Sequence, residues 1–228
     1  MPGRGPGPRR RTRDGADRGV LRRPGAPTGR ARARPGCRGR CRVRIWTGLG
    51  DDGSTGTLLG GRVGKDDPVV ELMGAVDEAV SALGVARALN DGDERLASYL
   101  LALQRGLFVV GADVVSAPGA RDRLEPGVSV VTADMVAELE SAIDTLTAER
   151  PLRPAFVVPG ENLASATLDL ARTAVRRAER RLVSVGRWRD DGVPGPALVY
   201  LNRASDLLYV LARRAAPADE PLSHDAAG

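Results

Sequence analysis

The chain has 228 residues, 42% of them apolar and 3% aromatic, which is enough to bury the core of one domain of ordinary size. Its formal charge of +5 combines two unlike parts, because residues 1–44 hold 15 arginines against two aspartates while the remainder is acidic. The basic character of the whole chain therefore argues little for nucleic-acid binding beyond that segment.

Residues 1–42 are rich in Arg, Gly and Pro, which predicts a disordered tail. The segment has neither the apolar stretch of a secretory signal nor the pattern of an amphipathic targeting helix. Two interpretations stay open: a genuine basic arm, or upstream codons of a GC-rich gene translated from a start placed too early. The 33 arginines against one lysine favour the second. Order is predicted to begin near Val43, with a short extended piece over 43–46.

Helical periodicity dominates after a polar loop over 47–61 that is rich in Gly, Asp, Ser and Thr. Pro68 suits the first turn of a helix, with Asp67 as its N-cap. After a break at 90–93, apolar residues over 96–114 step by three and four, which is the spacing of a bundle seam.

Three more helices are predicted. Thr132 can cap the third, the fourth runs from about Glu161 to Val185, and the fifth runs from about Ala197 to Ala215. The fold class is therefore an all-α bundle of five helices over 43–215, with an irregular, polar N-terminal loop. A flexible C-terminal tail is expected over 216–228.

Scarce residue types argue against several kinds of site. The single histidine, His224, lies in the polar C-terminal end, and Cys37 and Cys41 both lie in the N-terminal tail. A Ser-His-Asp triad, a Cys-His pair and a thiolate or His-rich metal site are therefore not expected. No run of 18 consecutive apolar residues occurs, which predicts that nothing spans a membrane.

The loop over 47–57 is the first candidate for chemistry, because glycines let backbone amides converge on an anion and hydroxyls add donors. It lacks the pattern of a Walker loop, so a plain surface loop is an equal alternative. Lys65, the one lysine, stands just beyond it, and a compact ammonium can sit between phosphate oxygens. Survival of one lysine under the codon bias is the competing explanation.

The fourth helix is the second candidate. Arg172, Arg176 and Arg180 share one face at a spacing of four, which indicates either a solvated row of ion pairs or a polyphosphate-binding row. On the fifth helix, Asn202 and Ser205 share a face among apolar residues, so a ligand or a buried hydrogen bond is expected there. Asp77 and Glu78, beside the apolar stripe of the first helix, call for a cationic partner.

Taken together and in this order, these motifs resemble the PduO-type ATP:cob(I)alamin adenosyltransferases. The runs A-R-T-x-x-R-R-A-E-R and L-N-R-x-S-D are specific in combination, and the resemblance covers about residues 43–215. The matching stretches are 47–53, 61–63 with 65–67, 76–78, 156–160, 171–173 with 176–180, and 201–203 with 205–206.

The resemblance implies a homotrimer of five-helix bundles with an active site at each subunit interface. ATP would be held by a loop of one chain and by helices of its neighbour, with Mg²⁺ on the phosphates and no metal ligand assigned to the protein. The loop residues would be Thr47, Gly48, Leu49, Gly50, Thr55, Gly56 and Lys65. The helix residues would be Arg176, Arg177, Ala178, Glu179, Arg180 and Asn202.

The resemblance also implies an activity: cob(I)alamin attacks the 5′ carbon of ATP, forming adenosylcobalamin and releasing triphosphate. The corrinoid supplies the nucleophile, so the protein needs no catalytic His or Cys. Arg176 and Lys65 would neutralise the leaving group, and Asp77 would pair with Arg172 across the interface. Phe156 would displace the lower axial ligand of cob(II)alamin.

Three positions depart from the family pattern. Gly48 stands where the family usually has Lys, Asp169 stands where it often has His, and Glu161 replaces the second glycine of P-G-G. The loss of one charge-assisted phosphate contact is worth roughly 1.5–3 kcal/mol. Weaker ATP binding is therefore expected, unless an arginine compensates.

Two alternatives to the enzyme stay open. The first is a weak or silent family member that binds adenosylcobalamin as a carrier or sensor, and Gly48 supports it. The second is a nucleic-acid-binding protein that uses the basic tail, which the acidic remainder and the scarcity of aromatic residues disfavour. We expect a cytoplasmic protein with a reductase and an adenosylcobalamin-dependent enzyme as partners, and with neither membrane nor nucleic acid bound.

Overall fold

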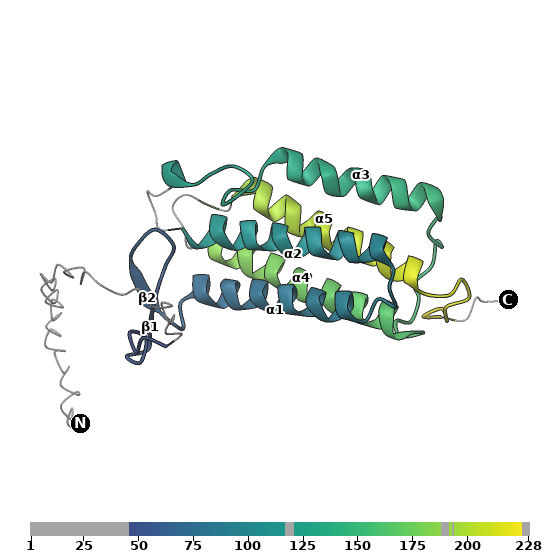
Figure 1. Ribbon diagram of the computed structural model, residues 1–228, viewed down its shortest axis with the longest axis horizontal. Coiled ribbons are helices and arrows are strands. Elements are labelled where there is room, and N and C mark those ends of the chain that lie inside the picture. Colours follow the sequence, from purple (N-terminus) through teal and green to yellow (C-terminus); the bar gives the residue numbers. More distant parts are fainter. Residues whose placement is uncertain (1–45, 117–120, 188–191, 193, 225–228) are drawn as a thin grey trace, which may run out of the picture. The chain divides into compact units, whose positions relative to one another are not determined.

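The computed structural model describes residues 46–116, 121–187, 192 and 194–224. The predicted tail over 1–42 lies outside these ranges, and so does the predicted extended piece over 43–46 apart from Trp46, which is in no strand. The described residues form two short strands, five α-helices and one 3₁₀ turn (Figure 1). In chain order they are β1 (Ser54–Gly56), β2 (Arg62–Gly64), α1 (Pro68–Ala88), α2 (Glu94–Val115), η1 (Arg121–Arg123), α3 (Ala133–Glu149), α4 (Leu163–Gly186) and α5 (Gly195–Ala215).

Side-chain caps fix where several helices begin, as the sequence predicts. Asp67 accepts a hydrogen bond from the amide of Val69 at 2.8 Å at the start of α1. Thr132 accepts one from Met135 at 3.3 Å at the start of α3. At α4 the cap is Asn162, which forms a reciprocal capping box with Ser165. This places the start of α4 two residues later than expected, because the side chain satisfies the first amides of the helix.

The N-terminal loop differs from the irregular segment that we expected, because part of it is an antiparallel hairpin. Thr55 of β1 faces Val63 of β2. The turn between the strands uses Leu59, Gly60 and Gly61, all with positive φ, which is backbone that glycine adopts without steric cost. Strands of three residues are too short for an alternating pattern, so the sequence gives no strand signal here.

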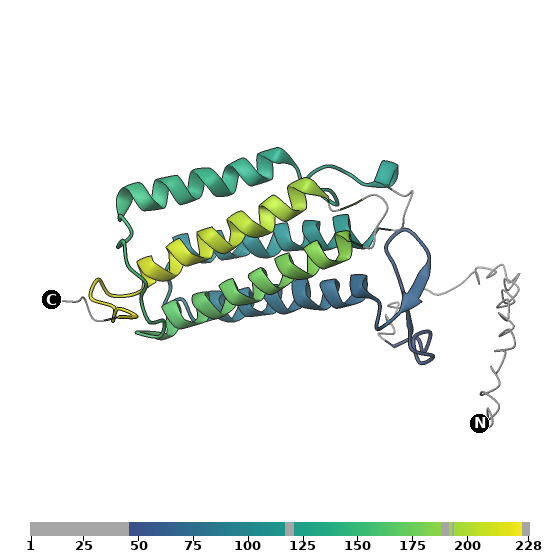
Figure 2. The same cartoon turned by 180° about the vertical axis from the view of Figure 1, so that it is seen from behind.

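The bundle places α1 between α2 and α4, and α5 between α4 and α3 (Figures 1 and 2). Helices α1 and α4 are antiparallel: Glu71 pairs with Arg181 at 3.0 Å, and Glu78 pairs with Arg177 at 2.5 Å. The hairpin therefore lies at the end of the bundle where α1 begins, whereas α4 begins at the other end (Figure 1). The 21 residues of α1 separate these ends by about 30 Å.

Leucines from all five helices fill the core. Helix α2 is, among the described residues, the one helix long and apolar enough to cross a membrane by length and composition. Its Leu100, Leu103 and Leu107 are buried in the bundle, which is the position of a core helix in a globular domain. The other fully buried leucines are Leu72, Leu83, Leu146, Leu168, Leu182, Leu201, Leu207 and Leu208.

Residues 216–224 differ from the flexible tail that we expected. They fold back on the segment between α3 and α4, where Val157 and Leu222 form an antiparallel bridge. Ala216 and Glu220 are buried, at 3% and 5% exposure. The partners of this segment lie about sixty residues earlier in the chain, so no local pattern could indicate the pairing.

Candidate active site

The glycine-rich loop and the one lysine lie together at the hairpin. The amide of Lys65 donates to the carbonyl of Gly53 at 2.9 Å, and a Cβ on Gly50 would stand 3.4 Å from the Lys65 Nζ. The ammonium therefore lies against Gly50. Gly48 has φ +73° and accepts a backbone hydrogen bond from Asp51 at 3.2 Å, so it turns the loop. This arrangement can offer amides and one cation to an anion.

Arg62, which the sequence reasoning did not single out, fastens this loop from β2. Its guanidinium donates to the carbonyl of Leu49 and to the hydroxyl of Ser54, with Nε at 3.0 Å from that hydroxyl. Hydrogen bonds from Ser54 lower the pKa of Asp52, and the Arg62 charge lowers it further. Two of the predicted loop residues, Thr55 and Gly56, lie in β1. The signal in the sequence that could have indicated this role of Arg62 was an arginine shortly after a loop rich in hydroxyl side chains.

A groove of about 600 Å³ lies between α3, α4 and α5. Arg172 and Arg176 of α4 line it, together with Arg203, Asp206 and Tyr209 of α5. The Arg172 guanidinium lies 5.9 Å from the centroid of the Tyr209 ring. Burial raises the pKa of Asp206, while Arg203 and Arg176 oppose the rise. Cationic and apolar walls together suit a ligand that has both charged and apolar parts.

Asn202 has the hydrogen-bond partners that its position on α5 predicts. Its amide nitrogen donates to Glu179 Oε1 at 3.1 Å, and its amide oxygen accepts from Arg203 at 2.6 Å. Arg203 continues to Glu140 on α3 at 2.8 Å. One hydrogen-bonded row thus joins three helices beside the groove. Its amide and carboxylate are held in place before any ligand arrives.

Other predicted residues lie away from the groove. Ala178 is fully buried and acts in packing. Arg177 is engaged with Glu78, and Arg180 donates to the carbonyl of Arg176 at 3.2 Å. Asp77 is exposed on α1 and forms no ion pair with any residue of the described ranges.

Phe156 is 82% exposed and belongs to the segment between α3 and α4. That segment lies at the end of the bundle opposite the hairpin (Figure 1). The Phe156 ring is therefore not part of the core of this chain, and its apolar surface is available to contact a ligand or another subunit. One chain therefore does not bring Phe156 near the glycine-rich loop.

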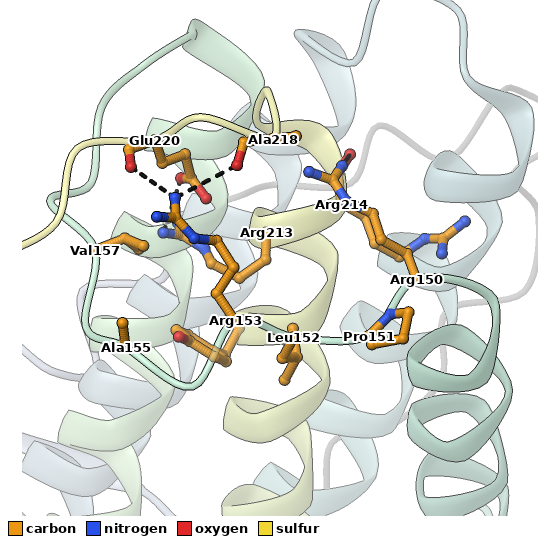
Figure 3. A pocket seen from close by; sticks show the side chains of 11 residues that line it. Arg150, Pro151, Leu152, Arg153, Ala155, Val157, Arg213, Arg214, Ala218 and Glu220 are labelled. Atoms are coloured by element: carbon orange, nitrogen blue, oxygen red, sulfur yellow. Dashed lines mark hydrogen bonds and ion pairs between the residues drawn. The ribbon is translucent and has the colours of Figure 1, made fainter.

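Beside the Phe156 segment, three buried charges form a set that sequence reasoning missed. Arg213 of α5 pairs with Asp169 of α4 and, at 2.9 Å, with Glu220 of the C-terminal segment. Asp169 also lies 3.4 Å from the Nε of Arg172. Burial raises the pKa of Glu220, and the Arg213 charge opposes the rise. These residues lie beside a small pocket of about 140 Å³, which Arg150, Arg153 and Arg214 also line (Figure 3).

No group of three or more His, Cys, Asp or Glu side chains within the described ranges could hold a metal ion. The expectation that Mg²⁺ binds through ATP phosphates alone stays a prediction.

Comparison with known proteins identifies the family of this chain. The family of cobalamin adenosyltransferases matches residues 45–215. A corrinoid adenosyltransferase from Citrobacter freundii is 42% identical over 173 residues, which are 75% of this chain and 93% of that protein. A corrinoid adenosyltransferase from Mycobacterium tuberculosis is 38% identical over 175 residues, which are 77% and 90% of the two chains.

Solved structures agree with these sequences. A variant PduO-type ATP:corrinoid adenosyltransferase from Lactobacillus reuteri, complexed with cobalamin and ATP, superposes with a TM-score of 0.67 at 31% identity. The match covers 75% of this chain and 92% of that one. A second variant, complexed with ATP, gives a TM-score of 0.69 at 30% identity, with 79% and 100% covered. The chain belongs to the PduO-type cobalamin adenosyltransferase family.

Proposed function

We propose that this chain transfers the 5′-deoxyadenosyl group of ATP to cob(I)alamin and releases triphosphate. The observation that carries the proposal is the pair of cationic surfaces in a member of this family. One is the glycine-rich loop with Lys65, and the other is the groove with Arg172 and Arg176. Both suit a polyphosphate that gains charge as it leaves.

The step is a displacement at carbon. The electron pair of cobalt(I) forms the bond to C5′. The C5′–O5′ bond breaks, and triphosphate departs with the electron pair of that broken bond. Lys65 and Arg176 neutralise the developing charge, together with Mg²⁺ on the phosphates. The protein otherwise holds C5′ facing cobalt, which turns a bimolecular encounter into an oriented one.

The active site is shared between subunits of a homotrimer. Within one chain, about 30 Å of helix separates the glycine-rich loop from the end of the bundle that carries Phe156. If the glycine-rich loop of one subunit lies against the groove of the next subunit, the two parts of the site come together despite this separation. In such an assembly the exposed Asp77 of the partner subunit is free to pair with Arg172.

Phe156 is the wall that keeps the lower face of cob(II)alamin without a ligand, which makes reduction to cob(I)alamin easier. Its 82% exposure leaves the ring free to contact a corrinoid. We expect Phe156→Ala to lower turnover from cob(II)alamin by at least about tenfold, and turnover from pre-reduced cob(I)alamin much less. Equal losses on both substrates would contradict the ligand-displacement role.

An anaerobic spectral assay with ATP, Mg²⁺ and cob(I)alamin tests the reaction directly. Formation of adenosylcobalamin is the expected result. A folded protein that forms no product yet binds adenosylcobalamin would favour the carrier or sensor alternative. Gly48 is the specific observation behind that alternative, because it leaves the loop without the ammonium that the family usually has there.

Deletion of residues 1–42 separates the enzyme from the nucleic-acid alternative. Adenosyl transfer is expected to persist in the shortened chain, and any affinity for nucleic acid is expected to vanish with the 14 arginines of residues 1–42. Loss of transfer in the shortened chain would show that the N-terminal segment belongs to the catalytic unit. We further propose that the reaction takes place in the cytoplasm, with a reductase supplying cob(I)alamin.

A further inference from the structure

We propose that residues 216–224, named here the C-terminal strap, position Phe156, and that Glu220, Arg213 and Arg153 act as positioning residues for it. This inference rests on the proposed function, in which Phe156 contacts the corrinoid. The Phe156 ring needs such positioning because it is exposed. A side chain that is 82% exposed has almost no packing to fix it, so its place must come from its backbone.

The backbone on both sides of Phe156 is held by the strap. The carbonyl of Phe156 accepts a hydrogen bond from the amide of Ser223 at 2.8 Å. Two residues on, the amide of Val158 donates to the carbonyl of Pro221, also at 2.8 Å. The segment thus gains, from another part of the chain, the pairing that it cannot supply itself.

Two arginines from the end of α3 and the segment after it hold the strap by its carbonyls. Arg150 donates to the carbonyl of Ala216, the first residue of the strap, at 3.1 Å, and to that of Arg214, near the end of α5, at 3.0 Å. Arg153 donates to the carbonyl of Glu220 at 2.9 Å and to that of Ala218 at 3.4 Å (Figure 3). Hydrogen bonds from a charged donor are stronger than those between neutral groups. The strap is therefore fastened at several points before it reaches Phe156.

The buried ion pairs anchor the strap to the bundle. The Glu220 and Arg213 side chains are 4% and 8% exposed and lie 2.9 Å apart, and the other terminal nitrogen of Arg213 contacts Asp169. Glu220 is thus tied through α5 to α4, the helix that carries the arginine row. Loss of the Glu220 charge breaks the ion pair between this set and the C-terminal segment, whereas Arg213 keeps its pair with Asp169, so one element loses its anchor while α4 and α5 stay joined. That element is the strap.

Glu220→Gln tests the proposal, with Asp219→Asn as the matched control on an exposed neighbour in the same strap. We expect amide hydrogen exchange at Val158 and Ser223 to quicken by at least about tenfold in Glu220→Gln and to stay unchanged in the control. Turnover from cob(II)alamin should fall by about tenfold, and turnover from pre-reduced cob(I)alamin should stay within about twofold. The electron paramagnetic resonance signal of four-coordinate cob(II)alamin should weaken in parallel.

Arg153→Ala is a second variant that tests the same proposal if Glu220→Gln fails to fold. It removes hydrogen bonds to the strap but leaves the buried ion pairs in place. The same faster exchange and the same selective loss are expected. Unchanged exchange at Val158 and Ser223 would overturn the strap, and faster exchange with unchanged cob(II)alamin turnover would overturn its positioning role. If the wild-type protein forms no adenosylcobalamin, the proposed function fails, while amide exchange still decides whether the strap holds the Phe156 segment.

Discussion

Asp169 takes its meaning from its partners rather than from its place in the sequence. It is buried at 6% exposure, and it contacts Arg213, which comes 44 residues later, and Arg172, which comes three residues later. The spacing to Arg172 was open to prediction, since residues three apart share a helix face. The contact with Arg213 was not, because it depends on how α4 and α5 pack. Asp169 departs from the family pattern in the sequence, and in the structure its buried charge is compensated by these two arginines.

Arg176→Ala tests the groove at the level of one side chain. Loss of a charge-assisted phosphate contact should raise the ATP concentration needed for half-maximal turnover by about 10- to 100-fold, which corresponds to roughly 1.5–3 kcal/mol. Asn202→Ala should act in the same direction, because it also leaves Glu179 and Arg203 without their common partner.

The control for both is Arg181→Ala. Arg181 lies on the same helix, but its guanidinium pairs with Glu71 on an exposed face of the bundle. Steady-state kinetics with ATP varied, together with light scattering to check the assembly, gives the comparison. A rise in the ATP requirement as large in Arg181→Ala would mean that general charge, rather than the groove, governs ATP binding.

Among the elements, the helices followed from local rules and the non-helical parts did not. Asp67 and Thr132 cap α1 and α3 as predicted, because the short polar side chain and the first turn that it caps are neighbours in sequence. The hairpin escaped prediction because it is held by Arg62, whose contact with Leu49 is thirteen residues away. The C-terminal strap escaped because Arg153 and Glu220 are 67 residues apart.

Gly106→Ala tests the packing of α2 on α5. A Cβ on Gly106 would stand 1.8 Å from the hydroxyl oxygen of Tyr200, a ring only 3% exposed. We expect the free energy of unfolding to fall by about 1–3 kcal/mol, since the core must shift to admit the methyl group. Gly74→Ala is the control, because nothing lies within 4 Å of its added Cβ, and gains of about 0.5–1 kcal/mol are expected there from helix propensity. Chemical denaturation measures both, and equal changes would contradict the close approach.

Glu149→Gln tests the ion pairs that tie α3 to α2 and α5. Glu149 accepts two hydrogen bonds from Arg95 and one from Arg214, and those from Arg95 chiefly lower its pKa below the ordinary value of 4.5. A lowered pKa in the folded state means stability that is present above pH 4.5 and is lost as the pH falls through the lowered value. The wild-type protein should therefore exceed the variant in stability at neutral pH, and the difference should close on acidification.

Denaturant midpoints of both proteins between about pH 3 and pH 7 measure this difference. The raised pKa of Glu220 acts in the opposite direction, but it is common to both proteins and cancels. A gap between the two proteins that stays constant with pH would show that the Glu149 charge contributes nothing.

At the scale of the whole molecule, mixed assemblies test whether the active site is shared. Lys65→Ala and Arg176→Ala chains should each be nearly inactive alone. When they are unfolded and refolded together in equal amounts, about a quarter of the sites should combine an intact loop with an intact groove. Adenosylcobalamin formation in the mixture measures the recovery, with either chain refolded alone as the control. A mixture as inactive as its parents would place both residues in one chain's site.

If the active site is shared between copies, as we propose from the separation of the glycine-rich loop and Phe156, the activity of the protein depends on its own concentration. A site divided between copies exists only while copies are associated, so its occupancy follows mass action rather than chain number. Below the dissociation constant of the assembly, halving the amount of protein would remove more than half of the activity. In a cell that makes little of this chain, adenosylcobalamin formation would then fall more steeply than the protein level. Ligands that bridge two copies would restore the activity by favouring the assembly.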